Sequence, residues 1–350
     1  MALDAAVLEA EIDAIFGLDR STSPATLLAP DLHAVHALSS HSSFLALAAG
    51  HAASYPHLLT PSPPSSHSRP HAPPDHQPPS SITQLRVALG LGVECVAHGP
   101  SYVFPATFAA TYTPHSWPLP PGVDLITSAS SNGDGVGVAA TALVRPGNWE
   151  PGEWADLTAG ALGPWAMAVV AADADAALGA AGDWHVRDSD EVSSSSVTRM
   201  TPVSICFCAR RTPSAAEAGI WTHPAHRGRR IAPAVVAAWA GLTQQESSSS
   251  SPSSPLPVTL PHLHDAVPSA EANGRRSHHN NSDGGSGGGG AEDDDDSGSS
   301  GNGRGRFTVF YSTSADNAAS QAVARRLGLA PFARIWKLHA RPVVDGARGG

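Results

Sequence analysis

Hydrophobic residues recur at helical spacing in two parts of the chain that lie far apart in sequence. Residues 4–18 carry an apolar residue at nearly every third or fourth position, which predicts an amphipathic helix. A second apolar stripe runs from about Arg229 to Leu242 and stops where a serine tract begins. Pro233 falls inside this stretch, and a helix that begins near Arg229 tolerates it because first-turn amides have no intrahelical partner.

Short apolar or alternating runs predict strands before and after the second helix. Three of them precede it with only loops between them, which indicates an antiparallel meander. Two more enclose a third predicted helix, which has Asp316 or Asn317 as its N-cap and Gly328 just past its end. This order predicts a mixed α/β fold with a largely antiparallel sheet flanked by helices, rather than a doubly wound nucleotide-binding fold. The five predicted strands cover residues 166–172, 203–209, 218–222, 306–312 and 332–340.

Three segments lack periodic apolar residues and are expected to be long disordered insertions. Residues 51–82 are rich in Pro, Ser and His, residues 188–198 contain a run of serines, and residues 244–304 combine serines, glycines and an acidic run. Such compositions bury too little apolar surface to offset the entropy of ordering a backbone. The chain is therefore expected to divide into a helical segment at 1–50, a linker at 51–82, a part at 83–162 and a domain at 163–340.

Composition and charge restrict the class of protein. A hydrophobic content of 41% in 350 residues is sufficient for a substantial core. The formal net charge of −10 argues against a general nucleic-acid coat, so no nucleic-acid partner is expected. The start of the chain resembles no leader peptide, and no apolar run has the length that spans a bilayer. We expect a cytoplasmic protein without membrane association, with the nucleus as the second candidate compartment.

The cysteines and histidines do not form a metal-binding pattern. Many of the 18 histidines fall in the low-complexity segments, and Cys206 with Cys208 cannot complete a zinc site alone. The odd count of three cysteines also argues against a disulfide framework and for a reducing compartment. No metal site is expected.

A glycine-containing turn between the third predicted strand and the second predicted helix collects three arginines, in the sequence THPAHRGRRIA. The unpaired amides and the dipole of a helix start favour an anion, and Arg227, Arg229 and Arg230 add full positive charges. A bound pyrophosphate is therefore one interpretation of this turn. The other is that the arginines are solvated, and the motif taken alone does not decide between them.

A second motif favours the first interpretation. EAGIWTHPAHRGRRIAPAVVAAW resembles the acetyl-CoA-binding strand, loop and helix of the GNAT superfamily of N-acetyltransferases, and FYSTSADNAASQAVARRLGLAPFARIWKL resembles the strand, helix and strand that follow it. Without the insertions, the resemblance covers about residues 163–338. It implies a GNAT-like acyl-CoA N-acyltransferase fold, acetyl-CoA as co-substrate, and direct attack on it by a small-molecule or peptide amine. A non-catalytic acyl-CoA-binding or regulatory module that retains the fold is the competing function.

The resemblance also implies a set of cofactor-binding residues. The family's loop pattern, Q/R-x-x-G-x-G/A, begins at Arg227, and its fourth position, usually glycine so that the backbone approaches the pyrophosphate, is Arg230 here. The strand before the loop borders the pantetheine arm in this family, and the asparagine that commonly contacts that arm corresponds to Asn317. The residues expected to bind acetyl-CoA are Ile220, Trp221, Thr222, Arg227, Gly228, Arg229, Arg230, Ile231, Ala232, Asn317 and Ser320.

Direct attack on a thioester requires a group that takes the proton of the amine. Glu217 is the candidate base because it opens the strand before the loop, where several members of the family place a glutamate that acts through water. The alternative for Glu217 is an exposed position or an ion pair with Arg210 or Arg211. His223 is a competing candidate because its imidazole is a common general base, but it precedes Pro224 at the entrance of the loop, where a surface role is favoured.

The usual acid of the family is missing. Many members place a tyrosine seven residues after the asparagine to protonate the departing thiolate, and that position is Ala324 here. Either another group protonates the thiolate, or the thiolate leaves without help at neutral pH. Tyr311 is a candidate acid because it lies near this region in the sequence.

The acceptor side of the site is expected in residues 83–162, where aromatic residues and carboxylates are concentrated in a chain otherwise poor in both. This combination suits a cationic amine. The alternative is that the aromatic residues belong to the core. The residues concerned are Tyr102, Phe104, Trp149, Glu150, Glu153 and Trp154.

Overall fold

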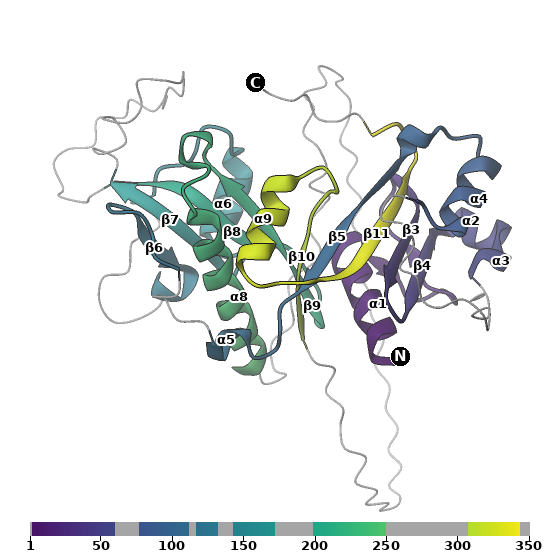
Figure 1. The fold of residues 1–350 in the computed structure, drawn as a ribbon, viewed down its shortest axis with the longest axis horizontal. Coiled ribbons are helices and arrows are strands. Elements are labelled where there is room, and N and C mark those ends of the chain that lie inside the picture. The colour runs from purple at the N-terminus through teal and green to yellow at the C-terminus, as the bar shows by residue number, and fades with distance from the viewer. Residues whose placement is uncertain are drawn as a thin grey trace, which may run out of the picture. The chain divides into compact units, whose positions relative to one another are not determined.

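The structure is a computed structural model, and Figure 1 shows its ribbon. All the residues that it describes belong to one of the two units into which the chain divides. The expected insertion at 188–198, and residues 250–304 of the expected insertion at 244–304, lie outside the described residues. The structure describes residues 2–59, 77–111, 117–131, 143–171, 199–249 and 307–343.

A mostly antiparallel sheet runs through the described residues, with the strand order β1-β2-β4-β3-β11-β5-β10-β9-β8-β7-β6. Among these strands, only the pairs β2–β4 and β9–β10 are parallel. The predicted mixed α/β fold with a largely antiparallel sheet is confirmed. The strands are β1 (Leu18–Asp19), β2 (Thr26–Leu27), β3 (Leu32–Ser39), β4 (Ser43–Ala48), β5 (Val96–Val103), β6 (Asp124–Thr127), β7 (Trp165–Ala171), β8 (Met200–Arg211), β9 (Ala215–Thr222), β10 (Thr308–Ser312) and β11 (Pro331–His339).

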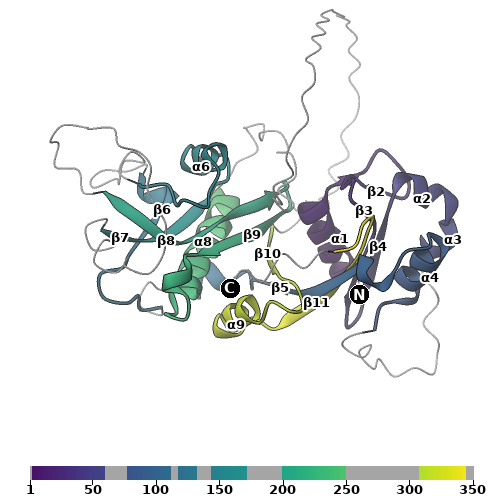
Figure 2. The ribbon, with the colours of Figure 1, turned by 90° about the horizontal axis from the view of Figure 1, so that it is seen from above.

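Helices cover both faces of the strands that follow β5 in the sheet. Helices α8 and α9 pack on one face of β7–β10, and α1 and α6 pack on the other, as Figure 2 shows for α9 and α6. Because side chains alternate along a strand, consecutive residues of β9 point to opposite layers. The helices are α1 (Ala2–Phe16), α2 (Ala49–Ser54), α3 (Pro56–Leu59), α4 (Ser80–Ala88), α5 (Phe108–Thr111), α6 (Pro151–Thr158), α8 (Ile231–Ser249) and α9 (Ala318–Arg326).

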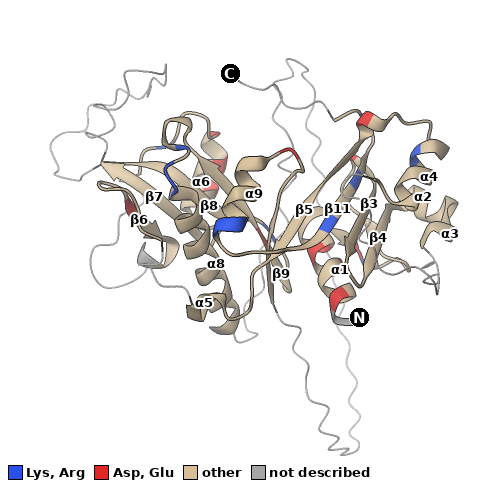
Figure 3. Cartoon of the chain, in the orientation of Figure 1, with Lys and Arg blue, Asp and Glu red and all other residues tan. Residues whose placement is uncertain are grey.

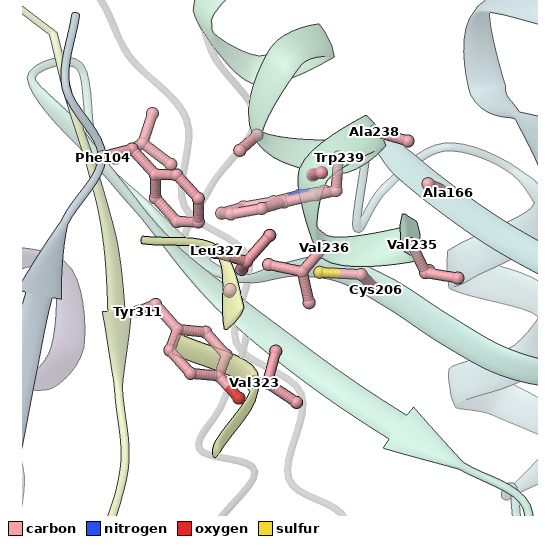
Figure 4. Close-up of a cluster of buried hydrophobic side chains, with 14 of the residues drawn as sticks. Phe104, Ala166, Cys206, Val235, Val236, Ala238, Trp239, Tyr311, Val323 and Leu327 are labelled. Atoms are coloured by element: carbon pink, nitrogen blue, oxygen red, sulfur yellow. The ribbon is translucent and has the colours of Figure 1, made fainter. Parts of the chain in front are cut away.

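The second predicted helix exists as α8 and fills the centre of the largest core cluster. Its predicted apolar stripe is buried, with Ile231, Val235, Val236 and Trp239 at most 1% exposed. The Trp239 ring meets the Phe104 ring edge to face at 6.3 Å between centroids (Figure 4). Burial of this kind is worth roughly 25 cal/mol per Å² of apolar surface, so the stripe is what fixes α8 on the sheet.

Helix α8 is longer than predicted. It continues to Ser249, so residues 244–249 are helical and do not belong to an insertion. The Gln244 side chain explains the difference, because its amide nitrogen donates to the Pro105 carbonyl at 2.8 Å and its oxygen accepts from the Ala109 amide at 2.9 Å. A polar side chain that is satisfied by a neighbouring segment holds the last turns of the helix in place.

The helical segment expected at 1–50 is helical only as far as Phe16 and again from Ala49, because residues 18–48 contain β1 to β4. These strands were missed because β1 and β2 have only two residues each, and because β3 and β4 do not alternate strictly between apolar and polar residues. The linker expected at 51–82 likewise contains the end of α2, all of α3 and the start of α4.

The apolar face predicted for the first helix is partly wrong. Ala6 is exposed, whereas Leu8, Ile12, Ile15 and Phe16 are at most 5% exposed. A second row, which includes Ala14, packs against β9 and β10. Helix α1 is therefore buried on more than one side, and this is why no single stripe describes it.

The domain expected at 163–340 lacks one strand that lies in the middle of its sheet. Strand β5 comes from the region expected to be a separate part, and it lies between β10 and β11 with antiparallel pairing to both. Strand β11 then pairs with β3 on its other side. The sheet is therefore continuous between residues from both ends of the chain.

Candidate active site

The parallel strands β9 and β10 separate part-way along their length. They pair from Thr308 opposite Ala215 to Phe310 opposite Glu217. Beyond this point β10 stays paired with β5, and β9 stays paired with β8. Residues 218–222 of β9 therefore have no strand partner on the β10 side within the described residues. Backbone N–H and C=O groups along such a free edge can pair with an extended ligand.

Two helix N-termini follow the strands that border this gap. Helix α8 follows β9 after the loop 223–230, and α9 follows β10 after residues 313–317. Because β9 and β10 are parallel, both connections leave the sheet at the same end, and both helices pack on the same face. The unpaired amides and the dipole of each helix place partial positive charge at that end.

The arginine loop has two residues in the left-handed backbone region. Gly228 has a φ of 77°, and Arg230 has a φ of 64°. Arg230 therefore keeps a backbone conformation that favours glycine, although it carries a side chain. For a residue with a Cβ this conformation costs roughly 1–2 kcal/mol.

Replacing Arg230 with glycine is expected to raise the free energy of unfolding by about 0.5–1 kcal/mol, because it removes this strain at a smaller entropic cost. Urea unfolding measures the change. Arg229→Gly is the matched control, since Arg229 does not have a positive φ and glycine there should destabilise. Equal effects of the two substitutions would contradict the assigned conformation.

The three arginines of the loop are exposed, and within the described residues none of them forms an ion pair. Arg227 Nε donates to the Thr222 carbonyl at 3.3 Å, which folds this side chain back over the end of β9. His223 Nδ1 accepts from the Ala225 amide at 3.2 Å. His223 therefore caps a short turn, as expected for a surface role rather than for a base.

Asn317 is the N-cap of α9. Its Oδ1 accepts from the Ser320 backbone amide at 3.0 Å, so the side-chain oxygen is already used within the protein. Gln321 Nε2 donates to the carbonyls of Ser314 and Ala315 at 3.2 and 2.8 Å and holds the loop before the helix. The part of Asn317 left for a ligand is its amide nitrogen.

The residues at the end of β9 use their side chains for packing. Ile220 contacts the core below α8, and Trp221 contacts the cluster below α6. The Thr222 hydroxyl lies 2.9 Å from the Ser204 hydroxyl. Ile231 is only 1% exposed, so its side chain also belongs to the core. These residues can contribute backbone groups to a ligand in the gap.

Glu217 lies where β9 and β10 separate. It is 7% exposed, and its Oε2 is 3.0 Å from Arg210 Nη1. The Ser312 hydroxyl of β10 donates to its Oε1. A β-bulge in β8 between Cys208 and Arg210 places Arg210 rather than Ala209 opposite Glu217. The ion pair with Arg210, one of the two alternatives, is therefore present, while Arg211 pairs with Glu246 at 3.1 Å.

Glu11 of α1 is a residue of this region that the sequence reasoning missed. It is fully buried and accepts a hydrogen bond from the Ser101 hydroxyl of β5. Burial raises its pKa from 4.5 to about 8, the hydrogen bond from Ser101 lowers the pKa, and the nearby charge of Glu217 raises it. Its position between Leu8 and Ile15 in the buried row of the helix was the available signal.

Tyr311 lies on the opposite face of the sheet from Glu217 and is 1% exposed. Its hydroxyl donates to the Ser320 carbonyl at 3.4 Å, and burial raises its pKa to about 12. A thiol has a pKa near 8.5, so proton transfer from this phenol to a thiolate would be uphill by roughly 4–5 kcal/mol. Tyr311 is therefore a poor acid. Ala324, where the family's tyrosine is expected, is fully buried in the same cluster.

The aromatic residues expected on the acceptor side are mainly core residues. Tyr102 and Phe104 are each 3% exposed and lie in the cluster below α8 and α9. Trp149 is 8% exposed and meets Phe207 edge to face. The other three residues of this group lie nearer the surface: Glu150 is exposed, and Glu153 and Trp154 of α6 are partly buried.

The described residues were searched for metal-binding groups and for membrane-spanning helices. No group of three or more His, Cys, Asp or Glu side chains in them is placed to hold a metal ion. None of their helices combines the length and apolar character needed to cross a bilayer.

No family model and no curated protein matches this chain. Solved structures do match it. The chain resembles the GNAT fold. A tandem GNAT protein from the clavulanic acid biosynthesis pathway is 12% identical, with a TM-score of 0.33, and the match covers 77% of this chain and 61% of that chain. A GCN5-related N-acetyltransferase from Sphaerobacter thermophilus is 15% identical, with a TM-score of 0.35, and the match covers 76% of this chain and 58% of that chain.

A Drosophila protein matches at 11% identity and a TM-score of 0.33, over 73% of this chain and 56% of that chain. This chain thus spans less than two thirds of the length of each of these three structures. At such identities and TM-scores these matches carry no argument about function, and the chemistry has to follow from this chain's own residues.

Proposed function

We propose that this chain is an N-acetyltransferase that moves an acetyl group from acetyl-CoA to an amine. The observation that carries the proposal is the gap between β9 and β10, with Glu217 where the strands separate and two helix N-termini after their far ends. An extended ligand that carries an anion at one end and a reactive group at the other fits such a gap. Acetyl-CoA has this form, because a pantetheine arm joins its pyrophosphate to its thioester.

The binding residues follow from the geometry. The free backbone edge of residues 218–222 would pair with the pantetheine arm, and the Asn317 amide nitrogen would donate to the same arm. The amides of residues 228–232 and the exposed side chains of Arg227 and Arg229 would hold the pyrophosphate. Bound acetyl-CoA would supply the thioester carbonyl that the amine attacks.

Glu217 is proposed to take the proton that the amine loses, directly or through a water molecule. It points to the α1 and α6 face of the sheet, whereas the two helix N-termini belong to the other face. The proposal therefore requires the thioester to reach the face of Glu217 between the separated strands while the pyrophosphate stays at the helix N-termini on the other face. With Tyr311 a poor acid, the proposal is that the thiolate departs unprotonated and takes a proton from solvent.

The competing function is a non-catalytic acyl-CoA-binding or regulatory module. Two observations favour it: Arg230 stands where the family has glycine, and the tyrosine position is the buried Ala324. The two functions differ in whether free thiol is released.

The deciding experiment incubates the protein with acetyl-CoA and a panel of polyamines, amino acids and histone-like peptides, and follows free thiol. An acetyltransferase releases thiol with at least one acceptor at a rate that rises with protein concentration. Acetyl-CoA that raises the melting temperature without releasing thiol above background would instead support the binding module. ADP at the same concentration is the control for a site that binds only phosphate.

The double substitution Arg227→Ala and Arg229→Ala is expected to weaken acetyl-CoA binding by about tenfold to a hundredfold, because two charge-assisted contacts to the pyrophosphate are lost. Isothermal titration calorimetry measures the affinity. Arg326→Ala removes an exposed arginine in the last turn of α9 and should leave the affinity unchanged. If the double variant also binds normally, the loop is not the pyrophosphate site.

A further inference from the structure

A second carboxyl group lies on the same face of the sheet as Glu217. Acidic residues are spaced along α1 (Figure 3), and one of them, Glu11, points into the protein. The Ser101 hydroxyl donates to Glu11, and the Ser312 hydroxyl donates to Glu217. Ser101 and Ser312 are directly opposite each other in the β5–β10 pair. Two adjacent serines thus connect the surroundings of the two carboxyls.

The two carboxyls differ in their partners. Glu217 has Arg210 at 3.0 Å, so its negative charge is compensated. Glu11 is fully buried, no cation pairs with it in the described part of the chain, and its Oε2 has no hydrogen-bond partner there. A buried carboxyl without a cation is far more stable with its proton than without it.

The other titratable groups on the elements around α1 are directed elsewhere. Lys337 of β11 places its Nζ 5.4 Å from the centroid of the ring of Phe16, the last residue of α1, which is more than one turn away from Glu11. On β3, His33 and His36 contact α2 and the start of α4. On α1 itself, Glu9 and Asp13 pair with Arg20 at the surface. The groups that face Glu11 are therefore Ser101, Glu217 and, through Glu217, Arg210.

We propose that Glu11 is a positioning residue for Glu217, acting through its charge and through the paired serines Ser101 and Ser312 that lie between the two carboxyls. The inference rests on the proposed function of Glu217 as the base. While Glu11 keeps its proton, it adds no charge to the surroundings of Glu217 and Arg210. When Glu11 loses its proton, a second negative charge enters these surroundings and changes the electrostatic field in which Glu217 acts.

The first test needs no activity. The infrared carbonyl stretch of a protonated carboxylic acid is separate from that of a carboxylate, and isotope-labelled glutamate identifies it. We expect such a band in the unmodified protein at pH 7, its loss in Glu11→Gln, and its retention in Glu9→Gln, a partly exposed position of the same helix whose carboxylate pairs with Arg20. A band that persists in Glu11→Gln, or that is missing in the unmodified protein, overturns the proposal.

The coupling is tested by the pH at which this band disappears. Glu217→Gln removes a negative neighbour and should lower the midpoint by about one pH unit. Ser101→Ala removes a hydrogen bond that favours the ionised form and should raise the midpoint. Both variants keep Glu11 itself, so the two opposite shifts of the midpoint test the proposal even if Glu11→Gln does not fold. An unchanged midpoint in Glu217→Gln overturns the coupling.

The positioning role is tested with an acceptor amine that shows activity. The pH profile of kcat/KM should contain an inflection near the midpoint of the infrared band, and Glu11→Gln should lack this inflection while its KM for acetyl-CoA is unchanged. A profile that does not change in Glu11→Gln overturns the positioning role. The band could be lost in Glu11→Gln and its midpoint shifted in Glu217→Gln although no amine is acetylated. That result would support the interaction of Glu11 with Glu217 and reject the proposed function, so failure of the one is distinguishable from failure of the other.

Discussion

Replacing Gly99 with alanine is expected to lower the free energy of unfolding by about 3 kcal/mol or more. Gly99 lies in β5, and a Cβ added there would be 1.8 Å from the Thr313 carbonyl oxygen. The contact is with backbone, so no side-chain rotation relieves it. The segment after β10 is held against β5 on both sides of this point, by Thr313 N to Pro100 O at 3.2 Å and Ala315 N to His98 O at 2.9 Å.

The same substitution should also reduce acetyl-CoA binding. Residues 313–317 lead into the N-cap of α9, so a displaced Thr313 moves the start of that helix. Urea unfolding measures the stability, and calorimetry measures the binding. Gly152→Ala in α6 is the matched control, because nothing lies within 4 Å of an added Cβ there. Alanine at position 99 with the stability of the unmodified protein would show that β5 and this segment do not cross so closely.

The protein is expected to lose stability as the pH rises from 4.5 to about 8, by roughly 4–5 kcal/mol in total from Glu11 alone. Burial raises the pKa of Glu11 above its value of 4.5 in the unfolded chain. Between the two pKa values the folded state holds a proton that the unfolded state has released. Raising the pH therefore favours unfolding until Glu11 ionises in the folded state as well.

His36 acts in the opposite direction at lower pH. Burial lowers its pKa from 6.5 to about 4, so folding loses stability as the pH falls below 6.5. The effect of Glu11 is therefore measured most clearly from pH 6.5 to 8, where about 2 kcal/mol should be lost. Urea unfolding at several pH values gives the slope. Glu11→Gln should remove it, whereas Glu9→Gln should keep it, and a slope that is equal in both variants would rule out Glu11 as its source.

The elements that could be predicted from sequence are those with strong local contrast. The stripe of α8 sets large apolar residues at helical spacing among small alanines, and the apolar runs at 203–209 and 306–312 are bounded by turn-like residues. In contrast, β3 and β4 place apolar residues next to one another, so their alternation is weak. The place of β5 could not be predicted, since it depends on pairing with strands more than two hundred positions later in the chain.

The sequence predicted only those parts of the candidate site that lie within a single short stretch of the chain. The arginine loop and Asn317 stand in one stretch each, and the departure at Arg230 was visible as a missing glycine. Its left-handed backbone and the use of Asn317 as a helix cap needed coordinates. Glu11 was missed because an acidic residue in a helix is ordinarily solvated, and only the packing of α1 on β9 and β10 makes it buried.

The position of β5 between β10 and β11 has a consequence for biosynthesis. A ribosome delivers β5 long before either of its neighbours, because β10 and β11 lie at the other end of the chain. During translation both edges of β5 therefore lack their partner strands until residues 308–339 have been synthesised. Long-range pairing of this kind slows folding and leaves strand edges open to association, so the nascent chain is expected to depend on chaperones.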